Sequence, residues 1–266
     1  MNADSMEQVG LLLAATAVFA LAGVVKGVVG LGLPTVSMAL LALLVPTGQA
    51  AAWLLLPSLV TNVLQMRPVG TLAPVWRSLW PLQAGVVLGT LGGLWWWGPV
   101  GAQALGRPLL GGALVAYALW GLWGRPLQVP VAWQGRWQGC VLGMVAGGVT
   151  GLVTALTGVF VVPAVAYLQA LQLPRTALVQ AMGLSFTVST VALGVGMATV
   201  GQPGSGAGPG LDAWAWGISA AMLLPAWLGM AWGERLRARL SAAAFKQVLM
   251  GSLLALGGYL LCSGAG

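Results

Sequence analysis

The sequence is short of charge and has no histidine. Its 266 residues include 11 Lys or Arg and 4 Asp or Glu, so 6% are charged. A soluble domain normally carries about 25%. This deficit excludes a soluble enzyme, a nucleic-acid binder and a disordered protein. Without histidine, the chain lacks the commonest metal ligand and general base, so we expect no metal site.

Other chemical signals are also missing. The two cysteines, Cys140 and Cys262, lie in apolar runs and form neither a metal motif nor a disulfide framework. The sequence contains no G-x-x-x-x-G-K-[ST] motif, which argues against an ATPase. No acidic residue stands in the middle of an apolar run. We therefore expect no enzymatic activity and no cofactor.

The sequence is instead rich in apolar residues and glycine. Hydrophobic residues make up 59%, there are 41 glycines and 14 tryptophans, and the mean hydropathy is +0.92. This composition predicts an all-α polytopic membrane protein. Residues 1–10 carry Asp4 and Glu7 but no basic residue. Because a cleavable signal peptide needs a basic start, we expect the first apolar segment to be retained.

The apolar runs set the number of membrane crossings. A helix needs roughly 20 apolar residues to span the bilayer core. Two runs, 35–45 and 159–171, are shorter than this, and each follows a Gly- or Thr-rich break. They would form re-entrant hairpins in an eight-crossing protein or short crossings in a ten-crossing one. The long runs are approximately 9–29, 49–66, 78–98, 104–124, 137–157, 176–200, 211–232 and 244–262.

The distribution of basic residues favours ten crossings. Cytoplasmic loops are enriched in Lys and Arg. Ten crossings leave only Arg107 on the outer face, with Asp4, Glu7 and Asp212, whereas eight crossings split the basic residues four to six. We therefore predict a multi-pass protein of the bacterial cytoplasmic (inner) membrane with both termini outside. The predicted cytoplasmic residues are Arg67, Arg77, Arg125, Arg136, Arg175, Arg235, Arg237, Arg239 and Lys246.

The chain also contains an internal duplication. The segment 23–34 aligns with 147–158 at an offset of 124, and in both halves a short apolar run follows. We predict a first five-segment repeat at 1–127, a linker at about 128–136 and a second repeat at 137–266. Because five is odd, the second repeat would be inverted. Inverted repeats with interrupted helices are typical of secondary transporters, whose substrate site lies near the repeat interface.

These features resemble the TauE/SafE sulfite-exporter family, also called TSUP. The resemblance rests on the repeated glycine-rich break and short helix. The first copy keeps Gly23, Gly27, Gly30 and Gly32, and the second keeps Gly147, Gly151, Gly158 and Pro163. The resemblance implies an exporter or importer of a sulfur-containing anion, sulfite or an organosulfonate. We predict export by alternating access, because an inside-negative potential favours outward movement of an anion. Uptake of a sulfonate, thiosulfate or carboxylate and an anion channel are the alternatives.

The two breaks are candidate anion sites. A helix that restarts inside a membrane presents free backbone N–H groups and the positive end of its dipole. Glycine there allows close approach of a ligand, although close helix packing would explain the same residues. The candidate substrate-binding residues at the breaks are Gly27, Gly30, Gly32, Pro34 and Thr35 in the first half and Thr154, Thr157 and Gly158 in the second.

Polar side chains supply the remaining candidates. Ser58, Thr61, Asn62 and Gln65 share one helical face, and Ser185 and Ser189 belong to a weaker stripe in the second half. They would either line a substrate path or bond neighbouring helices. Lys26 is the only charge inside an apolar run, where it would attract an anion or extend to the interface. The expected partners are a small anion and membrane lipid, with no nucleic acid; a homo-oligomer is left open.

Overall fold

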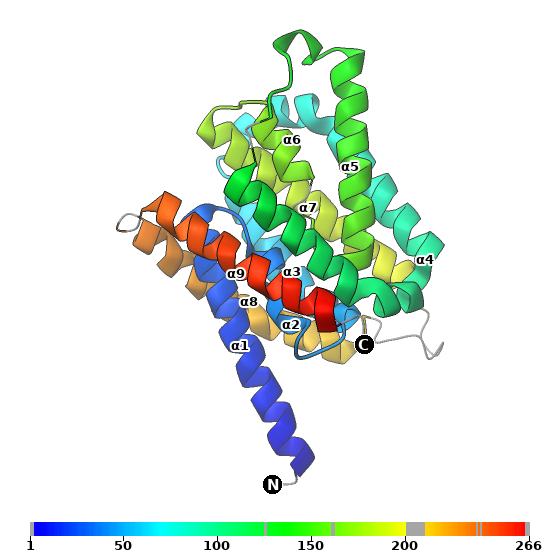
Figure 1. The fold of residues 1–266 in the computed structure, drawn as a ribbon, viewed down its shortest axis with the longest axis vertical. Helices are drawn as coiled ribbons and strands as arrows, with labels where there is room; N and C mark the ends of the chain where they lie inside the picture. The colour runs from blue at the N-terminus through cyan, green and yellow to red at the C-terminus, as the bar shows by residue number, and fades with distance from the viewer. Residues whose placement is uncertain are drawn as a thin grey trace.

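In the computed structural model, the described chain consists of residues 3–124, 127–160, 163–200, 211–237, 239 and 241–263. Within these ranges, the side chains of 3, 4, 99–105, 242, 243 and 263 are not described. The regular secondary structure of the described residues is helical (Figure 1). The helices are α1 (Ala3–Val29), α2 (Leu33–Leu41), α3 (Thr47–Gln65), α4 (Leu72–Trp123), α5 (Trp137–Thr157), α6 (Ala164–Ala170), α7 (Arg175–Val200), α8 (Ala213–Arg237) and α9 (Ala242–Ser263), with 3₁₀ turns η1 (Val69–Thr71) and η2 (Val131–Trp133).

The fold is that of a polytopic membrane protein. Each long apolar run predicted from the sequence lies in a helix. In the described part of the chain, five helical stretches are long and apolar enough to cross a membrane by length and composition. These stretches are Ser5–Val29, Trp137–Thr157, Arg175–Val200, Ala213–Arg237 and Ala244–Cys262.

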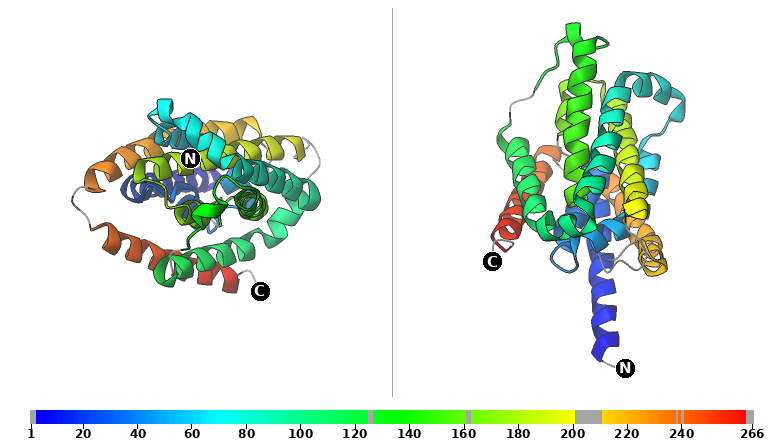
Figure 2. Two further views of the ribbon diagram at one scale, coloured as in Figure 1. Left: turned by 90° about the horizontal axis from the view of Figure 1, so that it is seen from above. Right: turned by 90° about the vertical axis from the view of Figure 1, so that its right-hand side faces the viewer.

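Helix α4 contains two of the predicted runs. The runs 78–98 and 104–124 form two helical arms that meet at a kink. The kink is at Gly98, which has φ 60° and ψ 176°. Side chains disfavour this backbone region, so a glycine allows the sharp change of direction. Helix α9 packs along the second arm of α4 (Figures 1 and 2).

The helices are interrupted at both predicted breaks. After α1, Gly30 and Gly32 adopt φ values of 80° and 110°, and Pro34 lies in the first turn of α2. Proline suits that position because its missing N–H would have no partner in the helix. Helix α5 ends at Gly158, whose φ is 69°. The helix expected directly after Gly158 begins only at Ala164 and has 7 residues.

Glycines bring two pairs of helices into close contact. On α1, a Cβ at Gly23 or Gly27 would overlap the backbone of α8, and Gly229 and Gly233 of α8 face the backbone of α1 in the same way. Small residues allow such close approach in membranes.

The second pair, α4 and α5, repeats this arrangement. Gly147 and Gly151 of α5 meet the backbone of α4, and Gly85 and Gly89 of α4 meet that of α5. These four glycines thus serve close helix packing.

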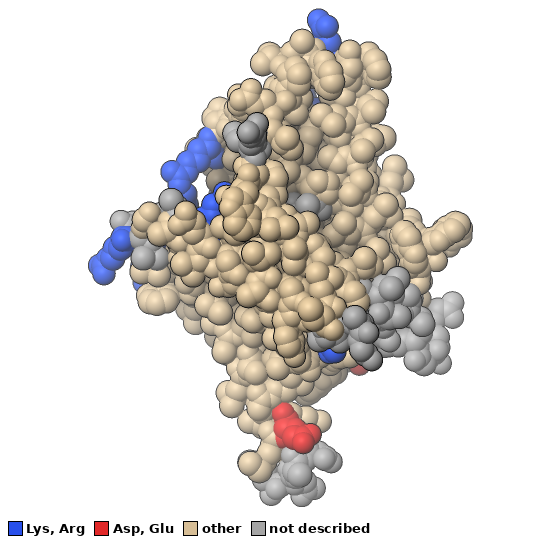
Figure 3. Space-filling model, in the orientation of Figure 1, with Lys and Arg blue, Asp and Glu red and all other residues tan. Residues whose placement is uncertain are grey.

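The polar ends of the molecule are unequal. Figure 3 shows most of the visible Lys and Arg toward the top and the upper left of the view, whereas the visible carboxylates, with one further basic group near them, lie lower down. The N-terminal part of α1 projects beyond the other helices at that lower end (Figures 1 and 2), and Ser5–Gly10 are exposed. The bundle therefore has one basic end.

Candidate functional site

Lys26 lies in the interior of the helix bundle. It belongs to the last turn of α1, and its side chain is 3% exposed. Its Nζ donates hydrogen bonds to Oγ1 of Thr61, at 3.0 Å, and to Oδ1 of Asn62, both on α3. The side chain is thus buried and points toward α3.

The charge of Lys26 is not matched by a carboxylate. Among the described residues, the structure contains no ion pair to this side chain, and both of its hydrogen-bond acceptors are neutral. An ammonium group has three N–H donors, so one is left for a further acceptor. A buried charge is costly unless it is paired. An anion placed beside Lys26 would therefore be strongly favoured.

A cavity of about 310 Å³ lies beside Lys26. Its wall combines the end of α1 with α3, α7 and α8. Glu234 and Arg237 come from the last turns of α8, so the cavity contains charges of both signs. The lining residues are Lys26, Gly27, Val29, Gly30, Leu64, Gln65, Val179, Met230, Glu234 and Arg237. The cavity is large enough for a small organic anion next to a buried cation.

The polar face of α3 connects this cavity to the bundle interior. Gln65 donates through Nε2 to the carbonyl oxygens of Gly30, at 2.9 Å, and of Val179, at 3.4 Å. Asn62 Nδ2 lies 3.5 Å from Oγ1 of Thr190 on α7. Ser58, one turn further in, is fully buried. Its Oγ and Oε1 of Gln65 have no hydrogen-bond partner in the described structure. These free polar atoms could bind a polar ligand.

The candidate residues of the first break divide into two groups. Gly27 and Gly30 line the cavity, and Gly27 also contacts the backbone of α8. Gly32, Pro34 and Thr35 are buried but do not line the cavity. Thr35 Oγ1 has no partner among the described atoms.

The candidate residues of the second half form a separate group. Thr154 and Thr157 donate to the carbonyls of Thr150 and Val153 in their own helix. Gly158 lies close to the side chain of Met38 on α2, so the two breaks are neighbours. Ser189 is 1% exposed. Ser185 accepts a 2.8 Å hydrogen bond from Nε2 of Gln83 on α4. None of these residues lines the cavity beside Lys26.

Sequence reasoning did not identify three polar residues that the fold brings to these groups. Arg237 is predicted from the sequence only as a cytoplasmic residue, and neither Glu234 nor Gln83 is predicted as a binding residue. A usable signal was present in α8, where Gly229 and Gly233 repeat the four-residue spacing of Gly23 and Gly27. That match indicates the α1–α8 contact, which places the end of α8 beside Lys26.

The described residues do not suggest a metal site, because they contain no group of three or more His, Cys, Asp or Glu side chains that could hold an ion.

Comparison with known protein families gave a match over most of the chain. The family model described as sulfite exporter TauE/SafE matches residues 15–260. Neither the search of curated proteins nor the search of solved structures found a match.

Proposed function

Because the chain belongs to the sulfite exporter TauE/SafE family, which is a family of membrane transporters and not of enzymes, we propose that it exports a small sulfur-containing anion. The substrate would be sulfite or an organosulfonate, moved across the bacterial cytoplasmic membrane by alternating access. The observation that carries the proposal is the buried Lys26, held by two neutral side chains at the wall of a cavity.

The architecture proposed for this transport is ten crossings in two inverted repeats, 1–127 and 137–266. The paired glycine contacts support it. Gly23 and Gly27 correspond to Gly147 and Gly151 at the offset of 124, and both pairs pack on a helix that carries its own glycine pair. Equivalent contacts of this kind are expected when two copies of one unit pack with opposite orientation.

The orientation proposed is that of a protein with both termini outside. It is supported by the collection of basic side chains at one end of the molecule (Figure 3). In this orientation, the cavity beside Lys26, Glu234 and Arg237 opens toward the cytoplasm. An anion would enter there before the site is exposed to the other side.

Lys26 would contribute electrostatic attraction, and the neutral groups would contribute orientation. With a monoanion bound to a charged Lys26, the site has no net charge, which lowers the cost of holding the anion in a low dielectric. The hydroxyl of Ser58, which has no partner in the described structure, and the second N–H of Asn62 could donate hydrogen bonds to sulfite or sulfonate oxygens. The inside-negative potential favours outward anion movement by about 2.3 kcal/mol per charge per 100 mV, so no proton-carrying carboxylate is required.

A panel of anions tests the substrate. We expect sulfite, thiosulfate, sulfoacetate or taurine to raise the melting temperature of the purified protein, because a ligand that binds only the folded state stabilises it. The same anions should be transported by protein reconstituted into liposomes. Acetate and succinate are the matched controls without sulfur. Transport of the carboxylates alone would contradict the proposed substrate class. Transport only toward the side of the liposome membrane that corresponds to the cytoplasm would favour uptake over export.

A further inference from the structure

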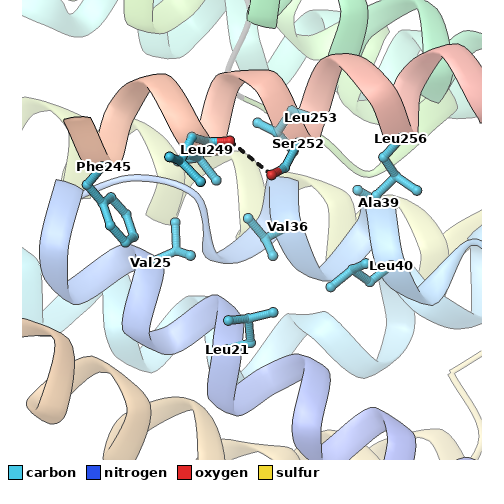
Figure 4. A pocket seen from close by; sticks show the side chains of 11 residues that line it. Leu21, Val25, Val36, Ala39, Leu40, Phe245, Leu249, Ser252, Leu253 and Leu256 are labelled. Carbon is cyan, nitrogen blue, oxygen red and sulfur yellow. Dashed lines mark hydrogen bonds between the residues drawn. The ribbon is translucent and has the colours of Figure 1, made fainter. Parts of the chain in front are cut away.

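An apolar groove lies between α1, α2 and α9. Figure 4 shows side chains from all three helices directed toward it. The groove encloses about 250 Å³. Leu21 and Val248 are 51% and 70% exposed, so the groove is open to the surroundings of the bundle. Its lining includes Leu21, Val25, Val36, Leu40, Phe245 and Leu256.

The groove is long enough to hold much of an acyl chain. It follows α9 from Phe245 to Leu256, which corresponds to about 17 Å at 1.5 Å per residue. An extended acyl chain of one leaflet crosses about 15 Å of hydrocarbon core, half of about 30 Å. The two lengths are therefore similar.

Basic side chains mark the surface at which this groove begins. Lys246 directly follows Phe245, at the start of α9. A second cavity, of about 360 Å³, is lined by Trp232, Arg235, Leu236 and Arg239 at the connection between α8 and α9. Arg235, Arg239 and Lys246 are exposed, and Trp232 is 59% exposed. Tryptophan beside clustered arginines is typical of the headgroup region.

We propose that this face binds an anionic phospholipid, with its phosphate and headgroup at Arg235 and Arg239 and one acyl chain in the groove between α1, α2 and α9. The combination of charge and apolar length selects this ligand. A helix from a partner protein would be wider than this groove, and its binding would not require basic residues at one end. A phospholipid supplies both an anionic headgroup and an acyl chain of the right length. This site is separate from the cavity at Lys26 and does not depend on the transported substrate.

The test compares two lipids with identical acyl chains, phosphatidylglycerol and phosphatidylcholine, added in mixed micelles to the purified full-length protein. We expect phosphatidylglycerol to raise the melting temperature more than phosphatidylcholine does. The double variant Arg235→Gln/Arg239→Gln should bind phosphatidylglycerol about 30-fold more weakly, since each basic residue near the surface contributes roughly a factor of five. Both arginines are exposed, so the variant should fold.

Two further variants separate the two parts of the proposed site. Arg107→Gln, which also removes an exposed arginine, is the matched control and should keep the preference for phosphatidylglycerol. Ser252→Phe fills the groove from α9 without replacing a buried side chain, and it should weaken the binding of both lipids. Equal shifts by the two lipids, an unchanged preference in the double arginine variant, or unchanged lipid binding in Ser252→Phe would each overturn the proposal.

Discussion

Replacement of Lys26 by glutamine is expected to reduce anion transport at least about 100-fold while the protein stays folded. Glutamine keeps a hydrogen-bond donor for Thr61 and Asn62 but removes the positive charge. Losing an interaction of about 2.7 kcal/mol with a bound anion would account for that factor, and buried charge–charge interactions reach this size. The measurement is saturable sulfite efflux from proteoliposomes, with the melting temperature recorded in parallel.

Two variants accompany this experiment. Lys246→Gln removes an exposed basic residue and should transport normally. Asn62→Leu removes the amide oxygen that accepts a hydrogen bond from Lys26. It should also impair transport if the polar face of α3 lines the substrate path. Normal transport by this variant would mean that Asn62 serves only helix packing. Wild-type transport by Lys26→Gln would contradict the proposed role of the buried charge, because no other described basic side chain donates to this face of α3.

A second large effect is expected from Gly147→Ala. A Cβ at this position would overlap the carbonyl oxygen of Leu82, so α4 and α5 would have to move apart. Overpacking of this kind typically costs about 1–3 kcal/mol. We therefore expect a clearly lower melting temperature in detergent and lower yields of folded protein.

The neighbouring glycine provides the control. A Cβ at Gly148 would have no atom within 4 Å, and alanine has the higher helix propensity. Gly148→Ala should therefore leave the melting temperature unchanged or raise it slightly. If both variants were equally stable, the close contact of α4 with α5 would not be a determinant of the fold.

Much of the fold could be predicted because hydrophobicity and glycine positions act locally. The long apolar runs lie in helices, and Gly30, Gly32 and Gly158 adopt the positive φ values that interrupt them. The helix after Gly158 was predicted to start too early. Val159 and Phe160 are not helical, and α6 begins at Ala164. The composition of these two apolar residues does not exclude a helical turn. The break at Gly98 coincides with the predicted end of the run 78–98.

The candidate site could be predicted only in part, since its contacts join distant segments. Lys26 and the stripe of Ser58, Asn62 and Gln65 stood out as polar residues in apolar runs. That Lys26 donates to Thr61 and Asn62 depends on the fold, which brings its side chain to α3 across 35 residues of sequence. The position of Glu234 and Arg237 beside Lys26 depends on the α1–α8 contact, more than 200 residues apart in the chain.

The most direct test of the proposed mechanism is sulfite flux from proteoliposomes under an imposed membrane potential and without a proton gradient. Proteoliposomes with a uniform orientation are loaded with sulfite, and a potassium gradient with valinomycin sets the potential. Potential-assisted export predicts saturable efflux that accelerates as the interior becomes more negative, and the acceleration should be lost in Lys26→Gln. Flux that is independent of the potential, or that strictly requires a proton gradient, would contradict the mechanism.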